Sequence, residues 1–283
     1  MKTIKFFIPL LTAIIILSCS DNSTGVNNVD KSTFTYPFTN GSSWNYQRTY
    51  NIQNIRPDSI KHYFPKTTIT ASGVISIMYD TLINSVSAKC FSESYVEDGN
   101  TILGRAYYIN NDSGLLCLAH RGNSVEEFPN RFSLNLKVIF NNRIFDNLSV
   151  LIKYYSGNEL PGFDNINDTL IMENKPVMCL SYPITEGKQW SYRSSNGISY
   201  INKKYIDFES VVLNNTSYSC IKCERTWVGQ NNLYCYDYYS KYGQLYKDYL
   251  MQNLMLTNEF GDTLGFFDTR DKVTVTSFTI PTK

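Results

Sequence analysis

The chain has 283 residues, 42% of them apolar and 18% charged, a composition that is typical of a folded globular protein and excludes a disordered one. Its 26 Lys and Arg residues nearly balance its 25 Asp and Glu residues, and the chain contains no basic block. The positive surface of a nucleic-acid-binding protein is therefore missing, and we expect no nucleic-acid partner.

The first residues predict a signal peptide. Lys2 and Lys5 make a positively charged start, and an apolar run follows from Phe6 to Leu17. That run is too short to cross about 30 Å of hydrocarbon, which takes roughly 20 helical residues. It has the length of a signal-peptide core, so we assign residues 1–18 to a signal peptide.

The end of the run, Ile16-Leu17-Ser18-Cys19, resembles the lipobox of bacterial lipoproteins. The resemblance implies that the Cys19 thiol receives a diacylglyceryl group, that the chain is cut just before this residue, and that the new N-terminus is acylated. Several acyl chains anchor a protein stably, because each buried methylene contributes about 0.8 kcal/mol. We expect a lipid anchor at Cys19 and a place in the cell envelope. The outer membrane is favoured, with the body in the periplasm or at the cell surface.

Residues 19–33 are almost entirely polar after the cysteine. Such a segment cannot bury enough apolar surface to offset the entropy lost on ordering. We interpret it as a flexible tether between the lipid and the body.

The body that follows predicts an all-β fold. Tyr reaches 22 residues and Thr, Ile and Val are abundant, and these side chains suit a pleated, half-buried surface. No segment keeps the i, i+3, i+4, i+7 apolar pattern of a long amphipathic helix.

The body also contains an internal repeat. Residues 36–46 align with residues 182–192, and six of the eleven positions are identical, among them Trp44 with Trp190. Residues 80–116 then align with residues 210–246 without a gap. A shared motif, Tyr-Pro…Gly-x-x-Trp-x-Tyr, opens each copy and resembles that of uncharacterised bacterial lipoproteins. The resemblance implies a β-rich exported domain and no particular activity.

We therefore expect antiparallel meanders from two duplicated units packed together. The first unit covers residues 34–178 with an insertion near 47–79, and the second covers residues 179–283. The alternative is one continuous curved sheet or half-barrel with a minor helix. Residues 132–155 are predicted to add a hairpin around Asn141-Asn142.

The sequence offers little support for catalysis or for a cofactor. His62 and His120 are the only histidines, no nucleophile–base motif surrounds either, and both are interpreted as surface residues. The acids that could form a carboxylate pair are Glu126-Glu127, Asp164, Asp168 and Asp237, without a diagnostic pattern.

The spacing of Cys220 and Cys223 resembles that of metal-binding or redox motifs. However, it lies in an extended segment, where residues three apart point to opposite faces. We expect no catalytic residue, no metal and no cofactor.

A disulfide between Cys223 and Cys235 is predicted from the repeat. If Gly229 is the tip of a hairpin, these two cysteines lie opposite each other across the strands. The equivalent pair about Gly99 in the first copy is Glu93 and Arg105, which carry opposite charges. Two reduced thiols in a buried sheet are the alternative.

Three classes of function remain open. The favoured one is a non-catalytic envelope module, binding or structural, with a glycan or a protein as candidate ligand. The second is a carrier that encloses an apolar ligand in a curved sheet, and the third is a hydrolase with an unrecognised carboxylate site. An aromatic face for sugars could be made by Trp44 with Tyr46 and by Trp190 with Tyr192. However, these aromatic residues occupy equivalent positions in both copies of the repeat, which favours a role in the core.

Overall fold

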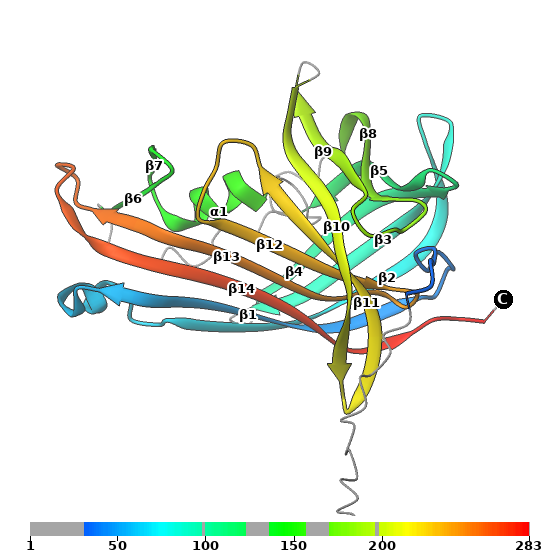
Figure 1. The fold of residues 1–283 in the computed structure, drawn as a ribbon, viewed down its shortest axis with the longest axis horizontal. Coiled ribbons are helices and arrows are strands. Elements are labelled where there is room, and N and C mark those ends of the chain that lie inside the picture. Colours follow the sequence, from blue (N-terminus) through cyan, green and yellow to red (C-terminus); the bar gives the residue numbers. More distant parts are fainter. Residues whose placement is uncertain (1–30, 98–99, 123–135, 157–169, 196–197, 283) are drawn as a thin grey trace, which may run out of the picture.

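The computed structural model describes residues 31–97, 100–122, 136–156, 170–195 and 198–282. Within these residues the protein is almost entirely antiparallel β-structure, in one 14-stranded sheet that one short α-helix and one 3-10 helix accompany (Figure 1). The all-β fold predicted from the sequence is confirmed. In the described part of the chain, neither helix is long and apolar enough to span a membrane.

The first half of the chain forms a meander of neighbouring strands. These are β1 (Ser43–Arg56), β2 (Thr68–Ile83), β3 (Val86–Glu97), β4 (Asn100–Asn111) and β5 (Gly114–Gly122), with β8 (Ile171–Ser181) paired to β5. The 3-10 helix η1 (Asp58–Tyr63) lies between β1 and β2. The turn between β2 and β3 is made by Asn84 and Ser85, which both have positive φ. This geometry matches the twist of a tight hairpin, and the sequence predicts a turn at the same place.

The second half repeats this arrangement. Its strands are β9 (Gln189–Ser195), β10 (Ile198–Leu213), β11 (Thr216–Trp227), β12 (Leu233–Ser240), β13 (Gly243–Thr257) and β14 (Thr263–Thr279). β2 and β10 both have 16 residues, and β3 and β11 both have 12. The halves differ most in their first strands, with 14 residues in β1 and 7 in β9. A common origin of the two halves and the division at residue 178 stay predictions, and β8 itself continues to Ser181.

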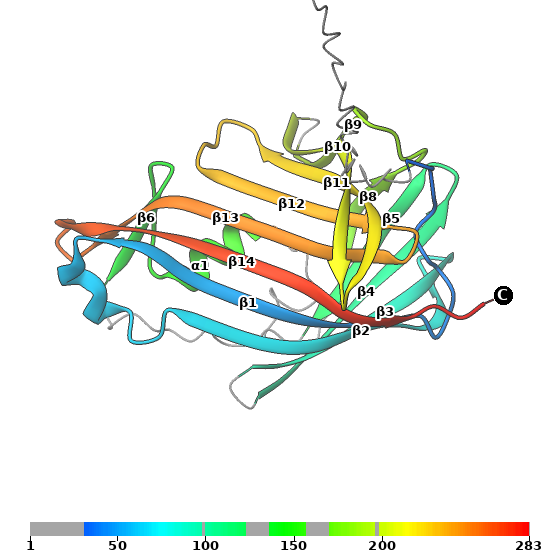
Figure 2. The same cartoon turned by 60° about the horizontal axis from the view of Figure 1, so that its bottom comes forward.

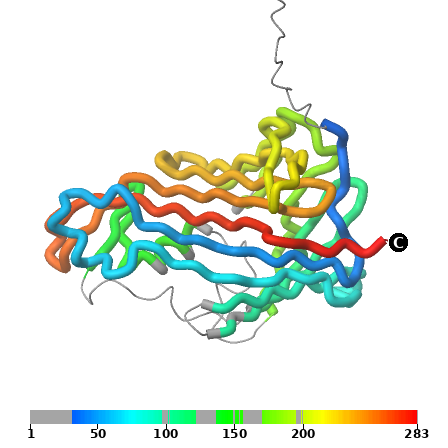
Figure 3. Tube along the Cα trace, turned by 90° about the horizontal axis from the view of Figure 1, so that it is seen from below, coloured from blue at the N-terminus to red at the C-terminus, as the bar shows by residue number. Residues whose placement is uncertain are grey.

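The two meanders are joined into one sheet by β14, which pairs with β13 on one side and with β1 on the other. The order along the sheet is β8-β5-β4-β3-β2-β1-β14-β13-β12-β11-β10-β9. Figures 2 and 3 show this sheet curving around its concave face. Side chains connect its two end strands: Arg193 donates to Glu173 at 2.7 Å, and Trp190 Nε1 donates to the Met178 carbonyl at 2.9 Å. The result is a nearly closed half-barrel, which fits both architectures expected from the sequence.

The segment after residue 135 corrects one expectation. A short hairpin does turn at Asn141-Asn142, between β6 (Lys137–Phe140) and β7 (Arg143–Phe145). The rest of the predicted hairpin is wrong, because α1 (Leu148–Ser156) forms there instead. The Asn147 side chain caps this helix by accepting the N–H three residues on at 2.9 Å. Leu151 and Tyr155 are buried, so one face of the helix packs into the apolar core.

The predicted core role of the repeated aromatic residues is largely confirmed. Trp44, Tyr46 and Tyr192 are 2%, 5% and 6% exposed. Trp190 is half-buried and packs against Tyr205, with ring centroids 4.7 Å apart. These rings fill the inside of the half-barrel and do not form an open sugar-binding face.

Candidate functional site

Several of the residues that the sequence singles out for chemistry lie outside the described part of the chain. Cys19 does, so lipid attachment stays a prediction. Glu126-Glu127, Asp164 and Asp168 lie outside it as well, which leaves Asp237 as the one described member of that set of acids.

The predicted opposition of Cys223 and Cys235 is wrong. Cys223 pairs with Asp237, and Cys235 pairs with Arg225. The β11–β12 connection spans residues 228–232 and is not a turn centred on Gly229, so the register is two residues away from the predicted one. The predicted disulfide is therefore not present: both thiols are free and fully buried, and burial raises the pKa of each.

The corresponding pair in the first half is not opposed either. Glu93 pairs with Gly104, and Arg105 pairs with Ser92. Glu93 points into the half-barrel and is 4% exposed, whereas Arg105 is exposed to solvent. The opposite charges of Glu93 and Arg105 therefore do not mark a cross-strand pair. They gave no valid reason to expect Cys223 and Cys235 to lie opposite each other.

The interpretation of the histidines is right for His62, which is exposed, and wrong for His120. His120 is 5% exposed, and its Nδ1 lies 3.5 Å from the Glu173 carboxylate, which also accepts from Arg193. His120 is buried because β8 pairs with β5 beside it. The sequence contains no clear pattern that predicts β8, so the burial of His120 could not be predicted.

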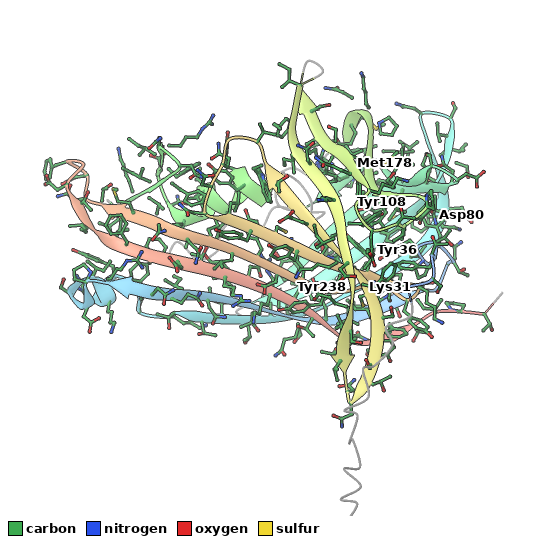
Figure 4. All side chains as sticks on the ribbon, viewed as in Figure 1. Lys31, Tyr36, Asp80, Tyr108, Met178 and Tyr238 are labelled. Atoms are coloured by element: carbon green, nitrogen blue, oxygen red, sulfur yellow. The ribbon has the colours of Figure 1, made fainter. Side chains whose placement is uncertain are left out.

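The strongest candidate site is a cavity of about 120 Å³ inside the half-barrel. Nearly every strand of both meanders contributes to its wall, together with Tyr36 from the extended segment before β1. Figure 4 labels two of the lining residues, Tyr36 and Tyr108, in the half of the molecule that holds β3, β5 and β8. A smaller cavity of about 60 Å³ adjoins it and shares Tyr36, Ile75, Glu93, Gln244 and Lys247.

A buried carboxylate organises the cations beside the cavity. Asp237 is fully buried. Its Oδ2 accepts from Arg225 Nε at 2.7 Å and forms an ion pair with Arg225 Nη2, also at 2.7 Å, while its Oδ1 accepts from Gln244 at 2.8 Å. Lys203 Nζ lies 4.0 Å from the same carboxylate. Burial alone would raise the pKa of Asp237, but Arg225, Lys203 and Lys247 together lower it below its ordinary value. Asp237 is therefore held as a charged structural partner and is not available as a proton donor.

Two charged groups on the cavity wall lack such partners. Glu93 Oε1 accepts from the Tyr46 hydroxyl, while its Oε2 is buried without any hydrogen-bond partner. Lys247 is 7% exposed, and among the described residues its ammonium has the Tyr249 ring 5.8 Å away but neither a hydrogen-bond acceptor nor an ion-pair partner within 4 Å. Burial and the Arg225 charge lower the pKa of Lys247, and burial raises the pKa of Glu93. A protein interior rarely leaves such groups unsatisfied, so they mark the place where a ligand or water would bind.

Other residues of the cavity wall are aromatic and apolar. Phe91 packs edge-on against Tyr108 at 4.7 Å and lies 6.4 Å from Tyr36, measured between ring centroids. Leu115 and Leu180 complete this wall. The site thus joins cationic residues to apolar ones, and motif searches could not find it because its members are scattered over the strands of both halves.

Comparisons with known proteins add little. No protein family and no curated protein sequence matches the chain. A Bacteroides fragilis structure, described as an exported protein with a YmcC-like fold, shows 10% identity over 88% of this chain and 100% of its own, with a TM-score of 0.29. A Parabacteroides distasonis structure, described as a lipoprotein, shows 11% identity over 87% of this chain and 99% of its own, with a TM-score of 0.32. Likeness at this level carries no inference about the present chain.

Proposed function

We propose that the protein is a lipid-anchored module of the cell envelope that holds a small ligand inside its half-barrel and catalyses no reaction. The anchor is the one expected at Cys19, with the outer membrane as the favoured location. The body is then a binding module whose ligand occupies the 120 Å³ cavity.

The observation that carries this proposal is the pair of unsatisfied groups on the cavity wall. Leaving a buried polar atom without a hydrogen bond costs about 1–3 kcal/mol, and more for a charged one. Glu93 Oε2 incurs this cost, and the Lys247 ammonium at the edge of the same space has the Tyr249 ring, 5.8 Å away, as its contact and no printed acceptor for its hydrogen bonds among the described residues. A bound ligand that pairs with these two groups recovers the free energy that their burial costs. A purely structural module has no need for such groups.

The cavity size agrees with a small ligand. A cavity of about 150 Å³ can hold a benzene molecule, whereas each liquid-like water takes about 30 Å³. The present cavity is close to the first value.

The other functions are less well supported by the described residues. A carrier of a purely apolar ligand would bury that ligand against Lys203, Arg225 and Lys247, which line the cavity. A hydrolase would need a free carboxyl pair, and Asp237 is already engaged by Arg225 and Gln244.

Native mass spectrometry of the full chain, purified from a bacterial envelope, tests the proposal. The wild-type protein should carry a small-molecule adduct that is released on denaturation. Ile75 lies across β2 and β3 from Glu93 and lines both cavities, so Ile75→Phe should fill the space and abolish the adduct. Ile198→Phe is the matched control, because Ile198 is 74% exposed, and it should keep the adduct. A folded wild-type protein without any adduct, or one whose adduct survives Ile75→Phe, would contradict the proposal.

A further inference from the structure

The charges around the two cavities do not balance. Four cationic side chains line them, against a single acid, Glu93; the cations are Arg48, Lys203, Arg225 and Lys247. The two arginines are neutralised, because two nitrogens of each lie within 2.9 Å of a carboxylate partner. These partners are Asp271 for Arg48 and Asp237 for Arg225. Two lysines then face one glutamate.

Lys203 is only partly satisfied. Its ammonium donates to the Cys179 carbonyl at 3.3 Å and sits 4.1 Å above the Tyr192 ring. An ammonium has three donors, so it keeps capacity for another acceptor. Lys247, whose strand neighbour is Asp237, has no hydrogen bond to a described residue at all.

Glu93 makes the local charge more positive still. Its burial favours the neutral carboxylic acid, since the pKa is raised. A neutral Glu93 has one O–H to donate and leaves the two lysines with Asp237, which Arg225 already engages and which lies 4.0 Å from Lys203 Nζ, as a nearby carboxylate. The wall is then a set of donors: two ammonium groups, one carboxylic acid and the Gln244 amide.

From these contacts we infer that the ligand is a small organic carboxylate with a short apolar or aromatic body. Its carboxylate accepts from Lys247, Lys203 and Glu93, and its body lies against Phe91 and Tyr108. This inference rests on the proposed function and names the ligand class of the same cavity.

A carboxylate fits the wall better than a phosphate does. When Glu93 is ionised, the two lysines leave one positive charge in excess, and the single negative charge of a carboxylate cancels it. When Glu93 is neutral, it can donate its proton to the carboxylate of the ligand. A phosphate dianion would place two charges beside Glu93 and would offer nothing to the aromatic wall. The aromatic and apolar residues of the wall include Tyr36 and Leu115 and need an organic body to cover them.

Isothermal titration of the full chain with defined probes tests the inference. The probes are butanoate and benzoate, their uncharged analogues butanamide and benzamide, and inorganic phosphate. At least one carboxylate should bind ten times more tightly than its amide and than phosphate. Each tenfold step corresponds to about 1.4 kcal/mol of binding free energy.

Variants connect any binding to the cavity. Lys247→Met should weaken carboxylate binding at least tenfold, and Lys203→Met provides a second, independent test. Lys222→Met is the matched control, because Lys222 lies on β11 and pairs with Glu209 at 3.0 Å away from the cavity. It should leave the affinity unchanged. Glu93→Gln keeps a donor on the wall and should reduce the affinity far less than Lys247→Met does.

The outcomes separate the ligand class from the proposed function. Amides that bind as tightly as the acids, or tighter phosphate binding, would overturn the carboxylate while the cavity stays a binding site. Carboxylate binding that survives both lysine substitutions would overturn it too. Absence of binding by every probe would refute the ligand class, whereas the adduct experiment with Ile75→Phe decides separately whether the cavity holds a ligand.

Discussion

Replacing Lys247 by methionine should make the protein more stable. The lysine stem is already buried at 7% exposure, and methionine has a similar length, so the apolar packing changes little. What disappears is a buried ammonium without a hydrogen bond to a described residue, next to the like charge of Arg225. Attraction to Asp237 and Asp271 offsets part of that penalty. Replacing buried charges by apolar groups gains about 1–4 kcal/mol, and we expect the lower part of this range, about 1–2 kcal/mol.

The pH dependence of this gain follows from the direction of the pKa shift. The pKa of Lys247 is lower in the folded protein than its ordinary value of about 10.4. Above that value the side chain is neutral in both states and costs nothing. As the pH falls toward the folded pKa, the unfolded state gains the proton first, so the wild type becomes less stable. The advantage of Lys247→Met should therefore be largest near neutral pH and vanish above about pH 10.4.

Urea unfolding followed by the fluorescence of the three tryptophans gives the comparison, in the absence of added ligand. Lys222→Met is the control, since its partly exposed ion pair with Glu209 is worth about 0–1 kcal/mol and its loss should not stabilise the protein. A Lys247→Met protein that is less stable than the wild type at neutral pH by 1 kcal/mol or so would refute the reasoning, because the ammonium would then have a stabilising partner.

Three further outcomes are expected. Cys19→Ala should move the protein out of the membrane fraction, and retention of the variant after a carbonate wash would show that another segment anchors it. Asp237→Asn leaves its arginine partner uncompensated and should cost about 3–5 kcal/mol, against less than about 1 kcal/mol for Asp248→Asn at a surface pair. Because the pKa of Asp237 is lowered, the stability that its ionised carboxylate contributes should be lost in the wild type only as the pH falls below about 4. Equal losses of stability for Asp237→Asn and Asp248→Asn would contradict the role of Asp237 as the buried partner of Arg225. Cys223 and Cys235 should react with an alkylating reagent only after unfolding, and a non-reduced digest that contains a bridged peptide would show that they form a disulfide after all.

The sequence was sufficient for the local features of the fold. Strand-forming residues predict the sheet, and Asn-rich turns such as Asn84-Ser85 lie where the backbone needs positive φ. It failed where a register depends on loop length, as in the five-residue connection at 228–232, because one glycine does not determine how a longer loop closes. It also missed α1, since the apolar residues Leu151 and Tyr155 occupy too short a segment to show a helical period.

The cavity was beyond reach for a different reason. Glu93, Lys203 and Lys247 lie on three strands, β3, β10 and β13, and only the closing of the sheet brings them to one space. In the sequence each looks like an ordinary solvent-facing charge in an alternating strand. The informative signal is their burial, which depends on the inside and outside faces of a curved sheet that no single strand reveals.

The position of β14 has a consequence for how the protein reaches its folded form. The strand β14 lies in the middle of the sheet, so β1, which pairs with β2 on one side, receives its second partner only from a segment about 200 residues further along the chain. Until β14 is in place, one edge of β1 stays open. Loss of residues 263–279 would leave β1 and β13 without their shared partner, each offering an unpaired edge to neighbouring chains. Pairing of β1 with β14 is thus a contact of high sequence separation, the kind that forms late and slowly in folding.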